Sequence, residues 1–383
     1  MRIGFRIGVF PAWEDNPYLN YLYLAARSRG AELLPATTYR SGIALLDRLG
    51  EGDVFHLHWT APVVQRADSQ EEAVERVDRF RDAIDAARAR GVLLVWTIHN
   101  VLPHDARYLA TEIALCQMIA DRADLVHVLS PATAELTAPY YTLPEDRVVR
   151  IPHPSYQGVY ANSARRDPTR AALGIRPADR AVLFFGQMRP YKGLTDLFEA
   201  IGRLSADQAA HTVLLLAGRT REEDLPVIEE HLPTNVRVVR DHSFIADADV
   251  DRWFRAADVA VYPYRAILNS GSLHLAATFG VRALLPAEAH LVDEFEGEDW
   301  IRFYDPEDPV SGIHTAVTDP STSAPVETSA AFSRRLSPWT VSVRFADALE
   351  DALRRPVAAE TVESEPGSGA APAAEAATGV AQG

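Results

Sequence analysis

The sequence predicts an α/β protein built from two Rossmann-like, doubly wound domains that face each other across a cleft. Short apolar runs alternate with helical patterns through roughly the first 150 residues, which is typical of a parallel sheet covered on both faces. The same alternation starts again near residue 180, after a polar stretch. The length of 383 residues exceeds one ordinary core and suits two domains of about 150 residues each.

The first half contains four runs that we expect to be strands: RIGVF (6–10), DVFHLHW (53–59), VLLVWTIHN (92–100) and DLVHVLS (124–130). We expect NPYLNYLYLAARSRG to form the helix after the first strand. Pro17 suits its first turn, Asp15 or Asn16 its N-cap and Gly30 its end. A long amphipathic helix is expected around residues 70–90.

The second half gives strands at AVLFFGQ (181–187), TVLLLAG (212–218), VRVVRD (236–241), DVAVYPY (258–264) and RALLPA (282–287). We therefore divide the chain into a first domain (1–155), a second domain (156–336), a helix that follows both domains (337–356) and a disordered tail (357–383). The tail is rich in Ala, Pro, Gly, Ser and Glu and has no periodic apolar face.

Composition excludes several classes of protein. The formal net charge of −15 argues against a nucleic-acid partner, which a basic face would normally bind. No stretch reaches the roughly 18 uncharged apolar residues of a membrane-spanning helix. Cys116 is the only cysteine, and the N-terminus reads as a strand and not as an export signal, so we expect a cytoplasmic location.

The motif GQMRPYKG (186–193) lies between a buried strand and a helix and contains the chain's only lysine. Gly186 lets a ligand approach the backbone closely. Arg189 and Lys192 lie beside a helix N-terminus, where free N–H groups and the helix dipole favour anions. The alternative is an ordinary solvated basic loop. The single Lys192 among 38 basic residues favours a diphosphate site.

A second small-residue turn, NSGS (269–272), opens the helix before RALLPA. The backbone N–H groups and hydroxyls of Ser270, Gly271 and Ser272 can hold a phosphate. The alternative is a plain serine N-cap. The chain has no G-x-G-x-x-G turn, P-loop or Cys/His metal cluster, so we expect no cofactor and no metal.

The motifs GQMRPYKG, LLLAG, DVAVYPY and SGSLHLAATFG before RALLPA resemble the GT-B glycosyltransferases, especially the retaining family 4 and its relatives. The resemblance covers most of residues 1–355. It implies that 156–336 is the nucleotide-sugar-binding domain, that 1–155 is mainly the acceptor-binding domain, and that the helix at 337–356 crosses back to the first domain. It also implies that Arg189 and Lys192 hold the donor diphosphate.

One departure concerns mechanism. Family 4 members carry two glutamates eight residues apart around the second phosphate helix, whereas ILNSGSLHLAATFG has none. This absence favours an inverting reaction. Glu288, just after the next strand, is a candidate for the donor hydroxyls.

In the first domain, His99 lies at the carboxyl end of a strand, which faces the cleft in doubly wound folds. The family has a matching histidine near the donor sugar, although a lone histidine is often structural. Asp15, His99 and Asp105 are the candidate catalytic bases for inversion. The segments FPAWEDNPYL, HLHW and TIHNVLPHD resemble bacterial exopolysaccharide transferases, including xanthan-type β-mannosyltransferases.

This narrower resemblance implies GDP-mannose as the first donor to try, and a glycan or lipid-linked oligosaccharide as acceptor. It also implies peripheral association with the inner face of the plasma membrane. Two other readings stay open at this point: a GT-B-like phosphorylase or epimerase, and a non-catalytic two-domain protein that binds sugar nucleotides. Lys192 is already assigned to phosphate, which leaves no lysine for a pyridoxal Schiff base.

Overall fold

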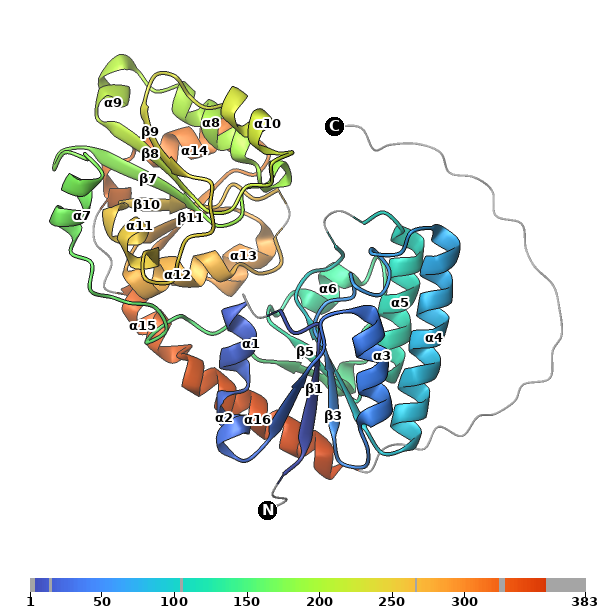
Figure 1. Ribbon diagram of the computed structural model, residues 1–383. Coiled ribbons are helices and arrows are strands. Elements are labelled where there is room, and N and C mark those ends of the chain that lie inside the picture. Colours follow the sequence, from blue (N-terminus) through green and yellow to red (C-terminus); the bar gives the residue numbers. More distant parts are fainter. Residues whose placement is uncertain (1–3, 14–15, 104–105, 266, 324–327, 356–383) are drawn as a thin grey trace.

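The computed structural model describes residues 4–13, 16–103, 106–265, 267–323 and 328–355. Within these residues it contains two six-stranded sheets whose strands are all parallel, each in its own domain (Figure 1). The predicted fold class is confirmed. The expected tail, 357–383, lies outside the described residues.

The first sheet has the order β2-β1-β3-β4-β5-β6. Its strands are β1 (Arg6–Phe10), β2 (Glu32–Pro35), β3 (Val54–Leu57), β4 (Leu93–Ile98), β5 (Leu125–Val128) and β6 (Val148–Arg150). The helices along this part of the chain are α1 (Pro17–Leu22), α2 (Leu24–Ser28), α3 (Tyr39–Arg48), α4 (Gln70–Ala89), α5 (Leu109–Arg122) and α6 (Thr133–Thr137), followed by the 3-10 turn η1 (Glu145–Arg147).

The second sheet has the order β12-β11-β10-β7-β8-β9. Its strands are β7 (Arg180–Phe185), β8 (Thr212–Ala217), β9 (Arg237–Asp241), β10 (Val259–Val261), β11 (Arg282–Pro286) and β12 (Ile301–Tyr304). The helices here are α7 (Arg166–Ala172), α8 (Leu194–Gly202), α9 (Ala206–Ala210), α10 (Leu225–Glu230), α11 (Val250–Ala256), α12 (Gly271–Phe279), α13 (Ala289–Glu294) and α14 (Pro309–Thr318), with 3-10 turns η2 (Pro190–Lys192) and η3 (Pro320–Ser323). Two further helices, α15 (Thr328–Arg335) and α16 (Pro338–Arg354), follow the second sheet.

Every apolar run predicted as a strand forms one. Most of these are central strands that are buried along most or all of their length, whereas β9 is a partly buried outer strand. All six residues of β4 and all six of β8 are buried. The sequence patterns missed β2, β6 and β12, which are outer strands of the two sheets. Their residues are only partly buried, so they lack a continuous apolar run.

The helix expected after β1 is divided in two. Asn16 caps α1 and Pro17 occupies its first turn, and Gly30 follows α2 with a positive φ of 93°. The break comes at Tyr23, whose backbone leaves the α region (φ −97°, ψ 7°). The Tyr23 hydroxyl bonds to two buried histidines on β3 and the residue that follows it, so a tertiary contact accompanies the break.

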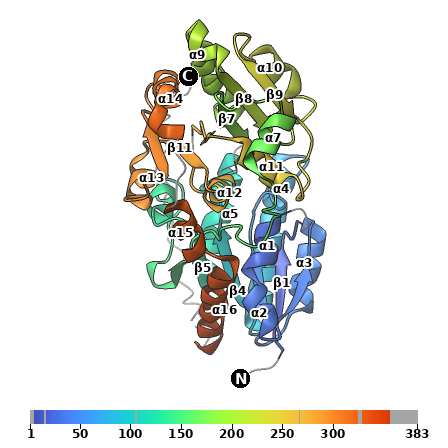
Figure 2. The ribbon, with the colours of Figure 1, turned by 90° about the vertical axis from the view of Figure 1, so that its left-hand side faces the viewer.

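Helix α16 returns to the first domain and lies along α2 and α1 (Figures 1 and 2). Val341, Phe345 and Leu349 of α16 are buried against the face of the first sheet that α3, α4 and α5 leave uncovered. Phe345 stacks on His56 with ring centroids 5.2 Å apart. The first sheet is therefore covered on one face by helices that precede the second domain and on the other partly by one that follows it.

We predict that Phe345→Ala destabilises the protein by about 3–5 kcal/mol, the usual cost of truncating a fully buried aromatic side chain. Urea unfolding measures this change. Trp339→Ala on the same helix is the matched control, because that side chain is 55% exposed, and it should cost far less. Equal losses in the two variants would show that α16 does not contribute its packing through Phe345.

Candidate functional site

The switch point of the second sheet lies between β7 and β10, where the strand order reverses. Ligands in open α/β sheets bind beyond the carboxyl ends of the strands at such points. The GQMRPYKG loop follows β7, and the loop that leads to Ser270 follows β10. The topology therefore brings the two predicted phosphate turns together.

Gly186 has a φ of +130°, which a residue with a side chain adopts only with strain. A Cβ atom built on Gly186 would lie 3.1 Å from the Ser272 hydroxyl oxygen and 3.9 Å from Lys192 Nζ. Gly193 is also left-handed, and a Cβ there would collide with the carbonyl oxygen of Pro263 at 1.8 Å. Both glycines thus allow the β7 loop to approach the loop after β10.

A cavity of about 640 Å³ lies between the domains at this place. From the second domain it is lined by Lys192, Ser270, Gly271, Ser272 and Glu288. From the first domain it is lined by His99 and by an apolar wall that contains Val101, Leu102, Leu136 and Tyr140. Figures 1 and 2 show α12, which begins at this cavity, at the edge of the second domain nearest the first.

Lys192 supplies a positive charge to this cavity. Its Nζ lies 5.4 Å from the centre of the Tyr264 ring, and no acidic side chain in the described part of the chain pairs with it. Burial lowers the pKa of Lys192 to about 8, because desolvation disfavours the charged form. An anion in the cavity would restore the stability of the ammonium.

The N-terminus of α12 lies on the same cavity. Ser270 is its N-cap, and its hydroxyl accepts a hydrogen bond from the Leu273 backbone N–H at 3.4 Å. Ser270 thus has the ordinary capping role. The hydroxyl of Ser272 is next to Gly186 and Lys192, and the first-turn amides of a helix lack intrahelical partners, so this end can receive an anion.

Arg189 lies apart from Lys192. It lines a neighbouring cavity of about 330 Å³ together with His58, Trp59 and His99. Its guanidinium forms an ion pair with Asp224 at 3.1 Å, so its charge is already partly neutralised. The two predicted cations therefore face adjoining spaces, and His99 lines both of them.

His99 is one of several buried histidines at the ends of the central strands. Its Nε2 lies 3.1 Å from Nδ1 of His58, and Trp59 stacks on its ring at 4.1 Å. Burial, with the neighbouring His58, lowers the pKa of His99 well below its ordinary value, so the ring is neutral near pH 7. Asp15 and Asp105, the other candidate bases, lie outside the described residues.

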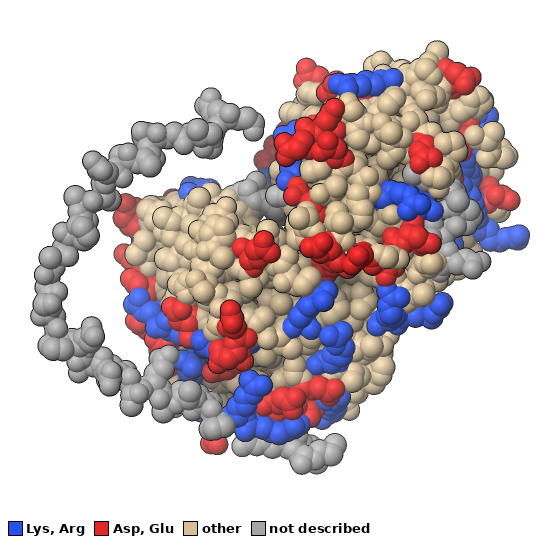
Figure 3. Space-filling model, turned by 180° about the vertical axis from the view of Figure 1, so that it is seen from behind, with Lys and Arg blue, Asp and Glu red and all other residues tan. Residues whose placement is uncertain are grey.

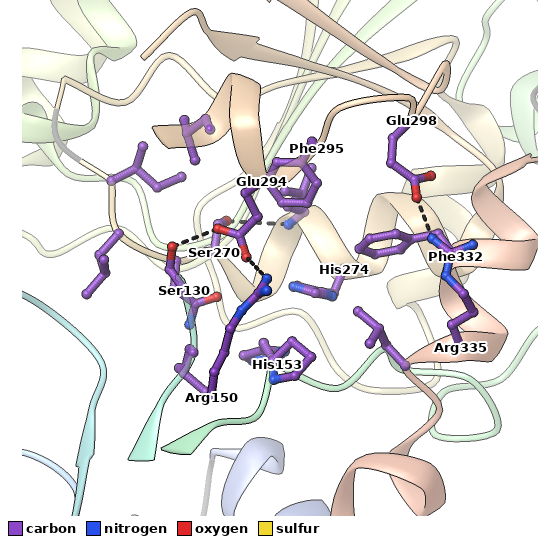
Figure 4. A pocket seen from close by; sticks show the side chains of 18 residues that line it. Ser130, Arg150, His153, Ser270, His274, Glu294, Phe295, Glu298, Phe332 and Arg335 are labelled. Atoms are coloured by element: carbon purple, nitrogen blue, oxygen red, sulfur yellow. Dashed lines mark hydrogen bonds and ion pairs between the residues drawn. The ribbon is translucent and has the colours of Figure 1, made fainter. Parts of the chain in front are cut away.

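A smaller cavity of about 170 Å³ also borders the N-terminus of α12 and shares Asn269 and Ser270 with the main cavity. In Figure 4, Glu294 of α13 points towards Ser130 and Arg150 of the first domain. Its carboxylate accepts a hydrogen bond from Ser130 at 2.7 Å and pairs with Arg150 at 3.4 Å. Burial raises the pKa of Glu294. These bonds join the domains beside the main cavity.

Sequence reasoning did not select Tyr264, His290 or Glu294 for the site, although Tyr264 lies within the quoted DVAVYPY motif. Their positions follow from the way loops from both domains converge, which a motif search does not show. In the parts of the chain that the structure describes, no group of three or more His, Cys, Asp or Glu side chains could hold a metal ion. No described helix is both long and apolar enough for a membrane span.

Comparisons with known proteins agree with this geometry. Residues 73–154 match the family model described as Glycosyltransferase Family 4, and residues 179–285 match the model described as Glycosyl transferases group 1. A GDP-mannose:glycolipid 4-beta-D-mannosyltransferase of Xanthomonas campestris pv. campestris is 25% identical over 301 residues, which is 78% of each chain.

The similar solved structures share the two-domain fold. The Anabaena protein HepE, crystallised with UDP-glucose, has a TM-score of 0.67 at 15% identity, over 91% of this chain and 100% of that one. WaaG, a glycosyltransferase involved in lipopolysaccharide biosynthesis, has a TM-score of 0.60 at 15% identity, over 91% and 99% of the two chains.

We predict that Lys192→Ala and Arg189→Ala each weaken binding of a nucleoside diphosphate tenfold or more, since a charge-assisted hydrogen bond contributes about 1.5–3 kcal/mol. Calorimetric titration measures the affinity.

The wild-type affinity for the nucleoside diphosphate should also weaken above pH 8, where Lys192 loses its proton, and Lys192→Arg should remove that pH dependence. Arg203→Ala, an exposed change on α8's C-terminal side, is the control. Unchanged affinity in both cavity variants would contradict the diphosphate assignment.

We also predict that the protein loses stability as the pH falls from about 6.5 towards 4. Burial lowers the pKa of His127 and His153 to about 4, so in this window the unfolded chain binds protons that the folded chain does not. Each histidine then removes up to roughly 3 kcal/mol of folding free energy. Urea midpoints at several pH values test this. His231→Gln, at an exposed site, should leave the slope unchanged, and a flat profile between pH 7 and 5 would contradict the prediction.

Proposed function

Because this chain is a glycosyltransferase of the GT-B fold that resembles family 4, we propose that it transfers a hexose from a nucleotide-sugar to a glycan or glycolipid acceptor. The reaction belongs to exopolysaccharide or cell-envelope glycan synthesis. Mannose from GDP-mannose is the first donor to test, since the related Xanthomonas protein is a GDP-mannose:glycolipid mannosyltransferase.

The observation that carries this proposal is the convergence of Lys192, Ser272 and the N-terminus of α12 on the 640 Å³ cavity between the domains. A diphosphate carries its charge on several oxygens, and an ammonium, a hydroxyl and helix amides can each take one of them. Arg189 supports the leaving group from the adjoining cavity once its pairing with Asp224 is exchanged or shared. Glu288 lines the same cavity, and in this proposal its carboxylate accepts hydrogen bonds from sugar hydroxyls.

The proposed transfer inverts the anomeric centre. A base takes the proton of the acceptor hydroxyl, the hydroxyl oxygen bonds to the anomeric carbon, and the bond from that carbon to the diphosphate breaks with its electron pair on the nucleoside diphosphate. His99 is the described candidate for this base, because it is neutral and lines both cavities. Asp15 and Asp105 are the other two candidates.

No metal is needed in this scheme. The charge that develops on the leaving diphosphate is stabilised by Lys192, by Arg189 and by the α12 dipole. These groups are held by the fold before substrate binds, so they do not have to reorganise during the reaction.

We place the acceptor against the first domain. The cavity wall formed by Val101, Leu102, Leu136 and Tyr140 is apolar, which suits the lipid-proximal part of a polyprenyl-diphosphate-linked glycan. The enzyme would act in the cytoplasm, at the inner face of the plasma membrane. Figure 3 shows basic side chains interspersed with acidic ones on the face drawn, so association there would depend on the acceptor lipid more than on surface charge.

Transfer is tested by incubating the purified chain with GDP-mannose, UDP-glucose or other nucleotide-sugars and a polyprenyl-diphosphate-linked oligosaccharide. We expect nucleoside diphosphate release that depends on the acceptor, survives EDTA, and yields a β-linked product by NMR of the anomeric proton and carbon. Lys192→Ala serves as the donor-deficient control. Phosphate-dependent release of a sugar phosphate would favour a phosphorylase, donor isomerisation an epimerase, and binding without turnover a non-catalytic protein.

The parts of the proposal fail separately. An α-linked product would exclude inversion, and loss of activity in EDTA that Mg²⁺ restores would exclude metal independence. Turnover with a soluble acceptor alone, without sedimentation of the enzyme with lipid vesicles, would exclude the membrane location.

A further inference from the structure

A continuous chain of hydrogen bonds runs through the core of the first domain and ends at His99. His127 Nε2 lies 2.8 Å from the carbonyl oxygen of Ile151, and its Nδ1 lies 2.9 Å from the Thr97 hydroxyl. That hydroxyl is 2.7 Å from His56 Nε2. The Tyr23 hydroxyl then joins His56 Nδ1 at 2.6 Å to His58 Nε2 at 2.7 Å, and His58 Nδ1 contacts His99 Nε2.

The members of this chain come from distant parts of the sequence but are buried together. His56, Thr97 and His127 are 0% exposed, and His58 is 2% exposed. They lie on or next to neighbouring strands β3, β4 and β5, whose register places His56 opposite Val95 and Thr97 opposite His127. Phe345 of α16 packs over His56 and His127 and helps to exclude water from them.

The direction of every hydrogen bond follows from the carbonyl at one end. A carbonyl oxygen only accepts, so His127 must carry its proton on Nε2. Burial lowers the pKa of His127, His56, His58 and His99, which keeps each ring neutral with one protonated nitrogen. His127 Nδ1 is therefore an acceptor, and Thr97 must donate its only hydroxyl proton to it.

The same reasoning continues along the chain. Because the Thr97 proton is used, His56 must donate from Nε2, and its Nδ1 must accept the hydroxyl proton of Tyr23. His58 must then donate from Nε2 to the Tyr23 oxygen, which leaves His58 Nδ1 as an acceptor. His99 can satisfy that acceptor only by donating from Nε2, so its Nδ1 carries a lone pair.

The surroundings of His99 fix the orientation of its ring and leave the lone pair on Nδ1 unpaired. Trp59 stacks on the ring with an interplanar angle of 16°, and Tyr18 contacts it edge-on at 5.1 Å, which fixes the plane of the ring. His99 Nδ1 has no hydrogen-bond partner among the described residues, and the side chain lines both cavities of the cleft. The free nitrogen is thus available to a substrate hydroxyl.

We propose that the hydrogen-bond chain from the Ile151 carbonyl holds His99 in its Nε2-protonated tautomer, so that Nδ1 receives the proton of the acceptor hydroxyl. This inference rests on the proposed function for the identity of the hydroxyl. Thr97, Tyr23, His56, His58 and His127 are positioning residues, and they act only through His99. The proton removed from the hydroxyl ends on His99 Nδ1, while the nucleoside diphosphate leaves with the electron pair of the broken bond.

The chain orients His99 and does not conduct protons away from it. A proton relayed inwards from His99 would stop on His127, because the Ile151 carbonyl that accepts from His127 Nε2 is not basic enough to take the proton. The imidazolium formed in each cycle must therefore return its proton through the cleft. The buried groups keep the tautomer ready for the next acceptor.

The tautomer can be measured without any substrate. In the full-length protein labelled with ¹⁵N-histidine, two-bond ¹H–¹⁵N spectra distinguish protonated from unprotonated ring nitrogens, and His99→Gln assigns the His99 signals. We expect His99 to show a protonated Nε2 and an unprotonated Nδ1. A protonated Nδ1 in the resting enzyme would overturn the proposal, whatever the enzyme transfers.

Thr97→Val tests whether the hydrogen-bond chain causes His99 to adopt its Nε2-protonated tautomer. This substitution keeps the side-chain shape but removes the hydroxyl, so the segment from His56 to His99 loses its fixed direction. We expect both His99 tautomers to appear and kcat to fall at least twofold, in proportion to the lost Nε2-protonated fraction, with the donor KM unchanged. Thr97→Ser, which keeps the hydroxyl, should recover the single tautomer and the lost rate.

A stability control separates an effect on the orientation of His99 from a general loss of folding stability. Val95 lies on the same strand, is fully buried and takes no part in the hydrogen-bond chain. Val95→Ala should therefore lower the melting temperature without changing the tautomer of His99. A single Nε2-protonated His99 with unchanged kcat in Thr97→Val would overturn the proposal. Failure of every variant and the wild type to transfer sugar, with the tautomer as expected, would instead contradict the proposed function.

Discussion

The structure depends on one constraint, which is that a parallel sheet must be covered on both faces. In the first domain, α3, α4 and α5 cover one face, and much of the other is covered by α16, which follows the second domain in the chain. The first domain is therefore completed only after the second has been made. This packing couples the domains through the core, and Phe345 is the side chain that lies over the polar centre of the sheet.

The polar centre consists of His56, Thr97 and His127, and the packing of Phe345 removes water from these side chains. A buried hydroxyl or imidazole is costly unless it is paired, and the histidines of β3 and β5 are paired in series. When neutral groups form a row of hydrogen bonds and a carbonyl oxygen accepts at one end, only one assignment of donors and acceptors satisfies them all. A requirement of stability thereby determines the protonation state of a residue at the cleft.

The two sides of the cleft differ in charge for a physical reason. The second domain presents Lys192, whose desolvated ammonium gains from an anion, beside a helix terminus that also favours anions. The first domain presents apolar side chains and His99. The lowered pKa of His99 keeps its ring neutral, as a group that accepts a proton from a hydroxyl must be. Glu294, bonded to Ser130 and Arg150, holds these unlike surfaces together next to the cavity.

The sequence by itself determined the fold class, the central strands and the positions of the two glycine-containing turns after β7 and β10, because apolar runs and glycines are local properties of the sequence. It did not determine the outer strands β2, β6 and β12, which are only partly buried. Nor did it determine the break at Tyr23, where the helix ends and the Tyr23 hydroxyl contacts two histidines. The pairing of Arg189 with Asp224 and the partners of His99 also needed the tertiary structure. His56 and His58 alternate visibly along one strand, but Tyr23 and Thr97 reach them only through sheet register and helix packing, which no local pattern encodes.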